Sequence, residues 1–349
     1  MNRLRRLAVR FRGPGAWRAW TGLGLLLLLA AYLGYILARN GAPEMDLRAL
    51  LARITPGDVA LVALIYGLTL VIAVLAWGLI IGSLSGYWGW MEHARIYVFT
   101  SLTRRLPGPG TFWHTLGRVV LYERLGVPRG LTAVAGGLEF VALVLGGVLV
   151  ALLTWPLVFG GQGLSPVLLL IPLLACAVLL NPPLVRALIQ RVGRAAGTPP
   201  VRYRQLMLWV GIFALIWCVG GLLLFVLVRA VAPIPLSLLP AIIGVWATAG
   251  VASTLFFSFL PFGLGATEVT LTALLSPFVA PGEAFFIALA LRVILTFCEL
   301  GYGLLGGLLY LPDLIAHRRP FAPPPEPEAR QEEEKPEEVY GPAPGIAPK

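Results

Sequence analysis

The stretch Leu106-Pro107-Gly108-Pro109-Gly110 interrupts an apolar run with residues that end or kink helices. A second break, Leu-Pro-Phe-Gly-Leu-Gly, occupies residues 260–265. In both copies a further proline follows, and an ionisable residue lies 11 positions after it, within an apolar segment (Pro128 to Glu139, Pro281 to Arg292). The spacing predicts an internal repeat, in which a broken helix precedes a membrane helix that carries a charge.

The composition is that of a membrane protein. Hydrophobic residues make up 58% of the 349 positions and charged residues 13%, whereas soluble domains carry about 25% charged residues. The net charge of +10 comes from arginines that cluster beside apolar runs, before residue 19 and in the 183–205 loop. Positive charge there orients helices and attracts anionic lipid, so a lipid bilayer is the expected partner and nucleic acid is not.

Six apolar runs are long enough to cross a bilayer: 19–38, 58–81, 131–155, 165–182, 206–230 and 284–311. The positive-inside rule places the basic N-terminus (1–18), the 183–205 loop and Arg318-Arg319 in the cytoplasm. We therefore expect a multi-pass protein of the plasma (inner) membrane with both termini cytoplasmic. The transmembrane domain would cover 19–315, and the Pro/Glu-rich residues 316–349 would form a disordered cytoplasmic tail.

Two broken segments remain, near 92–129 and 238–282. In this topology the first begins and ends on the cytoplasmic side of the membrane, and the second begins and ends on the outer side. We expect both to be re-entrant helical hairpins, although the first arm of the second segment is long enough to span. The expected fold is an all-α polytopic membrane protein with about six full spans and two re-entrant hairpins. Its two halves, about 57–182 and 205–312, would form an inverted repeat.

Five ionisable residues at or beside the breaks are the candidate substrate- or ion-binding residues: Arg118, Glu139, Glu268, Arg292 and Glu299. The helix breaks that would shape the site are Pro107, Gly108, Gly110, Pro261, Gly263 and Gly265. Ionisable side chains inside a membrane are costly and mark substrate or ion pathways. The glycines of the first break free backbone N–H groups at a helix end, which suits a phosphate near Arg118.

These residues also have structural interpretations. Arginines beside the first break fit interfacial anchors, and Glu268, in the first turn of its helix, fits a cap that complements the helix dipole. Arg292 and Glu299 lie about 10 Å apart along one helix, too far to pair directly. The simplest structural alternative is therefore a Glu139–Arg292 ion pair that holds the two halves in register.

The sequence contains no constellation typical of an enzyme. Its aspartates stand alone at Asp46, Asp58 and Asp313, so no paired-aspartate metal site exists. Nucleotide-binding motifs and a nucleophile–base pair are also missing. The three histidines and three cysteines are dispersed, without metal-ligand spacing. We expect no metal, no cofactor and no enzymatic activity.

The paired motifs resemble the lysylphosphatidylglycerol synthase/flippase transmembrane-domain family. The resemblance covers about residues 20–315 and rests on these positions: 106–108, Trp113, Arg118, Gly126-Val127, Glu139, 260–265, Glu268, Arg292 and Glu299. It implies a domain that moves lipids between leaflets. In the bacterial multiple peptide resistance factor this domain flips an aminoacylated phospholipid that a fused synthase makes. The present sequence ends soon after its last predicted helix, so we expect no fused synthase and no aminoacyl transfer, and the resemblance does not fix the lysyl head group.

The leading hypothesis is a lipid flippase for a polar-headed phospholipid or a polyprenyl-linked lipid. Arg118 would receive the phosphate, while Glu139, Glu268 and Glu299 would bind cationic or hydroxylated groups or carry protons. The alternative is a membrane subunit or partner of a lipid-linked glycosyltransferase or lipid-modifying enzyme. A third possibility is a scaffold whose acidic tail recruits a cytosolic protein.

Overall fold

The computed structural model describes residues 47–105, 110–159, 201–256 and 266–316, with isolated positions between 170 and 191. Most of these residues are helical, and no strand occurs among them. Several predicted features lie outside the described residues. They are the N-terminal region and first span, most of the 165–182 span, both helix breaks apart from Gly110, and the tail after residue 316.

The helices follow one another as α3 (Leu47–Arg53), α4 (Pro56–Ser85), α5 (Trp90–Ser101), the 3-10 helix η1 (Leu102–Arg105), α6 (Gly110–Glu123), α7 (Arg129–Phe159), α10 (Tyr203–Val231), the 3-10 helix η2 (Leu236–Leu238), α11 (Leu239–Phe256), α12 (Ala266–Leu275) and α13 (Pro281–Ala316).

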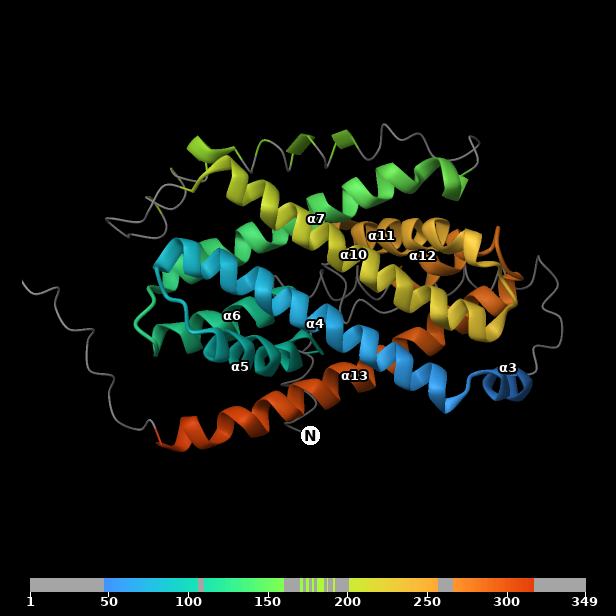
Figure 1. Cartoon of the computed structure of the whole chain (residues 1–349), viewed down its shortest axis with the longest axis horizontal. Helices are drawn as coiled ribbons and strands as arrows, with labels where there is room; N and C mark the ends of the chain where they lie inside the picture. The colour runs from blue at the N-terminus through green and yellow to red at the C-terminus, as the bar shows by residue number, and fades with distance from the viewer. Residues whose placement is uncertain are drawn as a thin grey trace, which may run out of the picture.

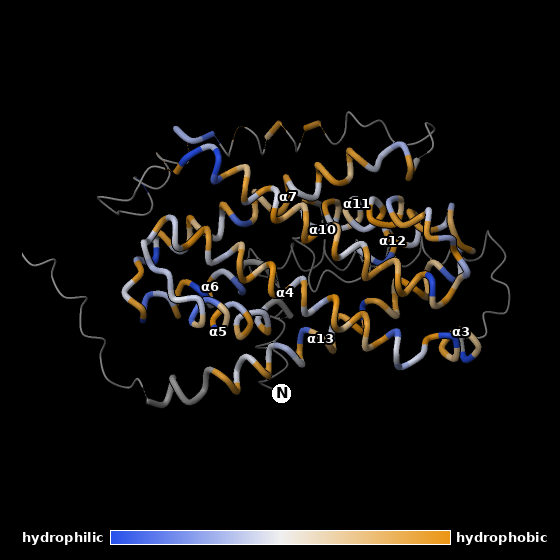
Figure 2. The backbone as a smooth tube through the Cα atoms, in the orientation of Figure 1, coloured by the Kyte–Doolittle hydropathy of each residue, from blue (hydrophilic) through white to orange (hydrophobic). Residues whose placement is uncertain are grey.

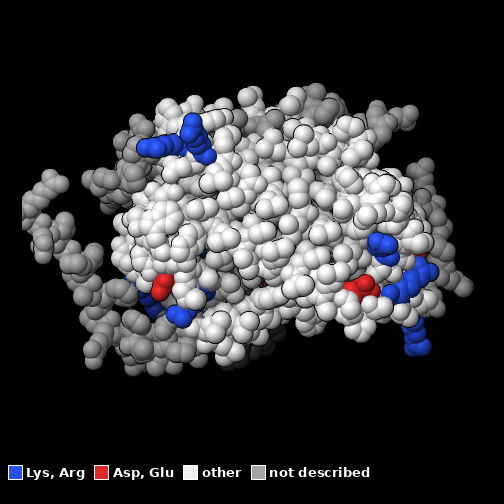
Figure 3. Space-filling view, in the orientation of Figure 1, with Lys and Arg blue, Asp and Glu red and all other residues white. Residues whose placement is uncertain are grey.

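Five helical segments are long and apolar enough to cross a membrane. Four are α4, α7, α10 and α13, which coincide with predicted spans, and the fifth runs from Leu236 to Leu255 in the first arm of the second broken segment. Apolar residues extend along these helices in Figure 2. Charged side chains gather toward the two ends of the face in Figure 3, with a broad, mostly uncharged band between them. Both features are typical of a membrane-embedded protein.

Local sequence signals account for the helix boundaries. Before α4, the Thr55 hydroxyl accepts a hydrogen bond from the Asp58 N–H, and the Asp58 carboxylate accepts one from the Thr55 N–H, with Pro56 at the first helical position. The helix ends at Ser85, and Gly86 caps it in the left-handed region at φ 72°. Gly126 has φ 80° and allows the tight turn from α6 into α7.

The described helices form two series with the same order: a long helix, an arm, a short helix after the break, and a second long helix. The first series is α4–α5–α6–α7 and the second is α10–α11–α12–α13. Figure 1 shows that α4 and α10 run in opposite directions, as do α7 and α13. The α5–α6 pair lies on the left of that view and the α11–α12 pair on the right.

The contacts between these eight helices are preserved when the two series are exchanged. The α7–α11 contact corresponds to α13–α5, α7–α10 to α13–α4, and α4–α7 to α10–α13. Within the series, α4–α5, α5–α6 and α6–α7 correspond to α10–α11, α11–α12 and α12–α13, and the α4–α10 contact corresponds to itself. The same pairs of elements are therefore in contact in both series.

Glycines let the long helices approach closely. A Cβ atom added to Gly146 of α7 would lie 2.7 Å from the backbone nitrogen of Ala214 in α10. A Cβ added to Gly221 of α10 would lie 2.6 Å from the Cα of Ile243 in α11. Small residues at such crossings are characteristic of helix packing in membranes, where van der Waals contact rather than hydrophobic burial drives association.

Candidate functional site

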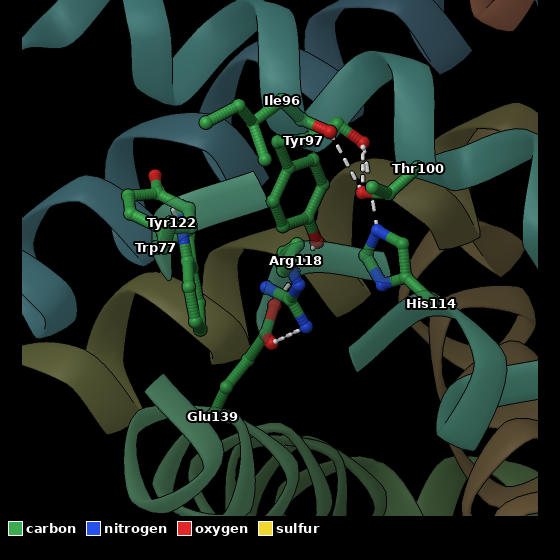
Figure 4. A network of polar contacts seen from close by, with 8 residues as sticks. All are labelled: Trp77, Ile96, Tyr97, Thr100, His114, Arg118, Tyr122 and Glu139. Atoms are coloured by element: carbon green, nitrogen blue, oxygen red, sulfur yellow. Dashed lines mark hydrogen bonds and ion pairs between the residues drawn. The ribbon is translucent and has the colours of Figure 1, made fainter. Parts of the chain in front are cut away.

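The first candidate site is a buried ion pair between α6 and α7. The Arg118 side chain donates from Nη2 to Oε2 of Glu139 at 2.5 Å, and Arg118 is 1% exposed and Glu139 8%. Tyr97 of α5 donates its hydroxyl to Oε1 of the same carboxylate at 3.1 Å. Figure 4 shows these three side chains converging from three helices. The carboxylate is therefore held by charged and neutral donors together.

Aromatic rings surround the guanidinium group of Arg118. Its central carbon lies 3.8 Å from the centroid of the Trp77 ring and 5.1 Å from that of Tyr97. Cation–π contacts of this kind stabilise an arginine that has left water. The Nε and Nη1 atoms are buried and have no hydrogen-bond partner in the described part of the chain. Because an unsatisfied buried donor is costly, these atoms form a ready place for an additional acceptor.

A second polar chain joins the same cluster. The Trp77 indole N–H donates to the Tyr122 hydroxyl at 2.8 Å, and that hydroxyl lies 2.6 Å from Nδ1 of His93. His114, 1% exposed, packs its ring edge-on against Tyr97, with 4.9 Å between the centroids. The α5 side chains His93 and Tyr97 thus face the same polar interior as Arg118.

Trp77, His93 and Tyr97 lie in the polar cluster although no sequence motif marks them as candidate site residues. One signal was available, because His93 and Tyr97 are four residues apart, as are His114, Arg118 and Tyr122 in turn. A spacing of four places side chains on one face of a helix. Which residue of α5 contacts which residue of α6 follows only from the packing of the two helices.

The second candidate site is an ion pair between α12 and α13. Arg292 donates from Nη1 to Oε1 of Glu268 at 2.7 Å. Glu268 is 7% exposed, whereas the Arg292 side chain is 23% exposed. The hydroxyls of Ser253 and Thr267, 3.0 Å apart, connect α11 to α12 beside this pair. Glu268 lies in the first turn of α12, as expected.

The two pairs occupy corresponding places with opposite signs. Each joins the short helix after a break to the long helix that follows. In the first series the short helix carries the arginine and the long helix the glutamate, and in the second series the order is reversed. The structural alternative of a Glu139–Arg292 pair is therefore wrong, because each of these residues pairs within its own series. The short helices supply the partners because tight turns fold them back on the long ones.

The remaining predicted residues are less informative. Glu299 lies half-buried on α13 and is a member of neither ion pair. Gly110 is the first residue of α6, while Pro107, Gly108, Pro261, Gly263 and Gly265 lie outside the described residues. Within the described ranges, no group of three or more His, Cys, Asp or Glu side chains is placed to hold a metal ion.

No protein-family model matches this sequence, and no curated protein matches it.

Proposed function

We propose that the chain is a lipid flippase of the plasma membrane that moves a polar-headed phospholipid or a polyprenyl-linked lipid between leaflets, as its resemblance to the lysylphosphatidylglycerol flippase domain implies. One observation carries the proposal. Arg118 sits at the core of an apolar helical protein, fully buried, yet keeps two N–H-bearing nitrogens without a hydrogen-bond partner in the described chain. A lipid phosphate supplies the acceptors that these nitrogens lack.

The head group would bind between the two ion pairs and its tails would stay in the bilayer. Binding of a phosphate to Arg118 weakens the hold of that arginine on Glu139, since both anions compete for one guanidinium group. Glu139 would then be free to take up a proton or a cationic or hydroxylated part of the head group. Glu268, already in the positive field of the α12 N-terminus, would act in the same way in the second half.

An inverted repeat gives this site a route to both leaflets. The antiparallel directions of corresponding helices, the placement of the two hairpins at opposite ends, and the exchangeable contacts support such a repeat. In this architecture one half rocks against the other and alternately opens a central site to each side. Re-entry of α5–α6 and α11–α12 from opposite faces would bring both breaks to the same interior.

A leaflet-accessibility assay tests the proposal. The purified protein is reconstituted into liposomes that contain trace lipids with fluorescent reporters, in a panel of zwitterionic, anionic, aminoacylated and polyprenyl-linked lipids. A membrane-impermeant quencher then reports transfer between leaflets. We expect faster transfer than in protein-free liposomes for at least one class that carries phosphate. If every lipid in the panel moves no faster than without protein, the alternative of a partner subunit for a lipid-modifying enzyme takes its place.

A further inference from the structure

An apolar groove of about 670 Å³ opens between α4, α5 and α13. Its floor includes Leu70 and Val74, which are 7% and 8% exposed. Its rim includes Met91 and Leu305, which are 61% and 52% exposed. Helix α5 separates this groove from the Arg118–Glu139 site, because Met91 and Val98 face the groove while His93 and Tyr97 face the polar cluster.

In the correspondence between the two series, α4, α5 and α13 match α10, α11 and α7. The groove therefore corresponds to the junction of α10, α11 and α7. That junction is filled. Trp217 of α10 donates its indole N–H to the carbonyl of Leu143 in α7 at 2.8 Å. Its ring lies against Gly147 of α7 and Gly250 of α11, so closely that a Cβ added to either glycine would meet the ring within 2.8 Å.

The groove is therefore not a general property of this three-helix packing. Leu70 and Trp217 are each the fifteenth residue of their helix, counted from Pro56 in α4 and Tyr203 in α10. One series thus places a leucine where the other places the tryptophan that closes the junction. The groove therefore lies beside the leucine that has the same helix position as the tryptophan of the filled junction.

We propose that the α4–α5–α13 groove is a binding site for one acyl chain of a phospholipid that the proposed flippase transfers. The inference rests on that proposed function. The chemistry of the lining selects the occupant, since the wall is apolar and two of the three helices that form it, α4 and α13, are long and apolar enough to cross a membrane. Among the described residues that line it, Arg95 is the charged one, and its positive charge complements a lipid phosphate.

Site-specific photocrosslinking tests the occupant. A diazirine amino acid is placed at Met91 in the full chain, in vesicles of phosphatidylethanolamine and phosphatidylglycerol, and the products are identified by mass spectrometry. The same probe at Leu64 is the control, because Leu64 is 68% exposed on α4 and does not line the groove. We expect more phospholipid adduct at Met91 than at Leu64. Equal adducts at both positions, or a crosslink from Met91 to the apolar segment 19–38 of the chain, would overturn the inference.

A variant in which a tryptophan ring fills the groove provides a second test of the proposal. Leu70→Trp introduces the residue of the closed junction, and Leu64→Trp adds the same ring on the outer surface. With Leu70→Trp, we expect adduct formation at Met91 to fall to the Leu64 level and lipid transfer to fall to the protein-free rate, while Leu64→Trp changes neither. If a folded Leu70→Trp protein transfers lipid at the wild-type rate, the proposed role of the groove is wrong, but the flippase proposal is unaffected. Selective lipid capture without transfer of any lipid contradicts the flippase and leaves the acyl-chain site standing.

Discussion

At the residue scale, the surroundings of Arg118 determine what Glu139 contributes to stability. Both side chains are buried, so removing one charge leaves the other uncompensated in a medium of low polarity. We predict that Glu139→Gln lowers the free energy of unfolding by about 3–5 kcal/mol. Thermal unfolding of the purified protein in detergent measures the effect as a lower melting temperature.

Glu123→Gln is the matched control on the neighbouring helix. Glu123 pairs with Arg129 at 2.6 Å, but their side chains are 42% and 70% exposed. Exposed pairs of this kind contribute about 0–1 kcal/mol. A melting temperature for Glu139→Gln that equals that of Glu123→Gln would show that Arg118 does not depend on its partner.

The charged residues of the two ion pairs could be identified as candidates from the sequence, because an ionisable residue in an apolar run is conspicuous. Their pairing could not. Spacing from the prolines marks Glu139 and Arg292 as equivalent, yet equivalence does not reveal which residue faces which. The partner of Glu139 depends on how the turn at Gly126 folds α6 against α7. Trp77 and Tyr97 were missed for another reason, since an aromatic residue in an apolar helix has the same pattern whether it packs in the core or stacks on a cation.

At the element scale, the crossing of α7 and α10 depends on Gly146. An added methyl group would collide with the backbone of Ala214, which cannot move as a flexible side chain can. We predict that Gly146→Ala destabilises the protein by about 1–3 kcal/mol through overpacking. The shift in melting temperature reports it.

Gly137, on the same helix, provides the comparison. A Cβ added there meets no heavy atom within 4 Å. Alanine is also the better helix former by about 1 kcal/mol, so Gly137→Ala should be neutral or stabilising. If both alanine variants melt at the wild-type temperature, the two helices do not cross as closely as described.

The element boundaries show where sequence signals are strong. The capping box of α4 and the proline before α7 mark helix starts through local hydrogen bonds and fixed φ angles. By contrast, the apolar groove and the filled junction with Trp217 could not be predicted. Leu70 and Trp217 are both apolar residues in spans, and only the three-helix packing shows that one leaves space and the other fills it.

At the scale of the whole molecule, the opposite orientation of the two series predicts on which side of the membrane each loop lies. If the proposed inverted repeat is right, the loops after the short helices would lie on opposite faces of the membrane, with the α6–α7 turn on the cytoplasmic side and the α12–α13 turn on the outer side. Arg124→Cys and Ser276→Cys, both exposed positions, are introduced into a background without the native cysteines. We expect an impermeant maleimide to label Ser276→Cys on intact cells and Arg124→Cys only in inverted vesicles. Labelling of both from one side would refute the inverted repeat.

The most direct test of the central claim combines lipid transfer and stability in one variant. Glu268→Gln removes a charge and a titratable proton but keeps the size of the side chain. The Arg292 side chain is 23% exposed, against 1% for that of Arg118, so losing the charge of Glu268 costs less than losing that of Glu139 and the variant should melt close to the wild type. Glu283→Gln is the control, since Glu283 pairs with the exposed Arg53 outside the site.

The measurement is the initial rate of transfer of the best-moved lipid in liposomes that contain wild type, Glu268→Gln or Glu283→Gln. We expect Glu283→Gln to match the wild type and Glu268→Gln to fall to the protein-free rate while its melting temperature stays near normal. A stable Glu268→Gln protein that transfers lipid at the wild-type rate would contradict the account.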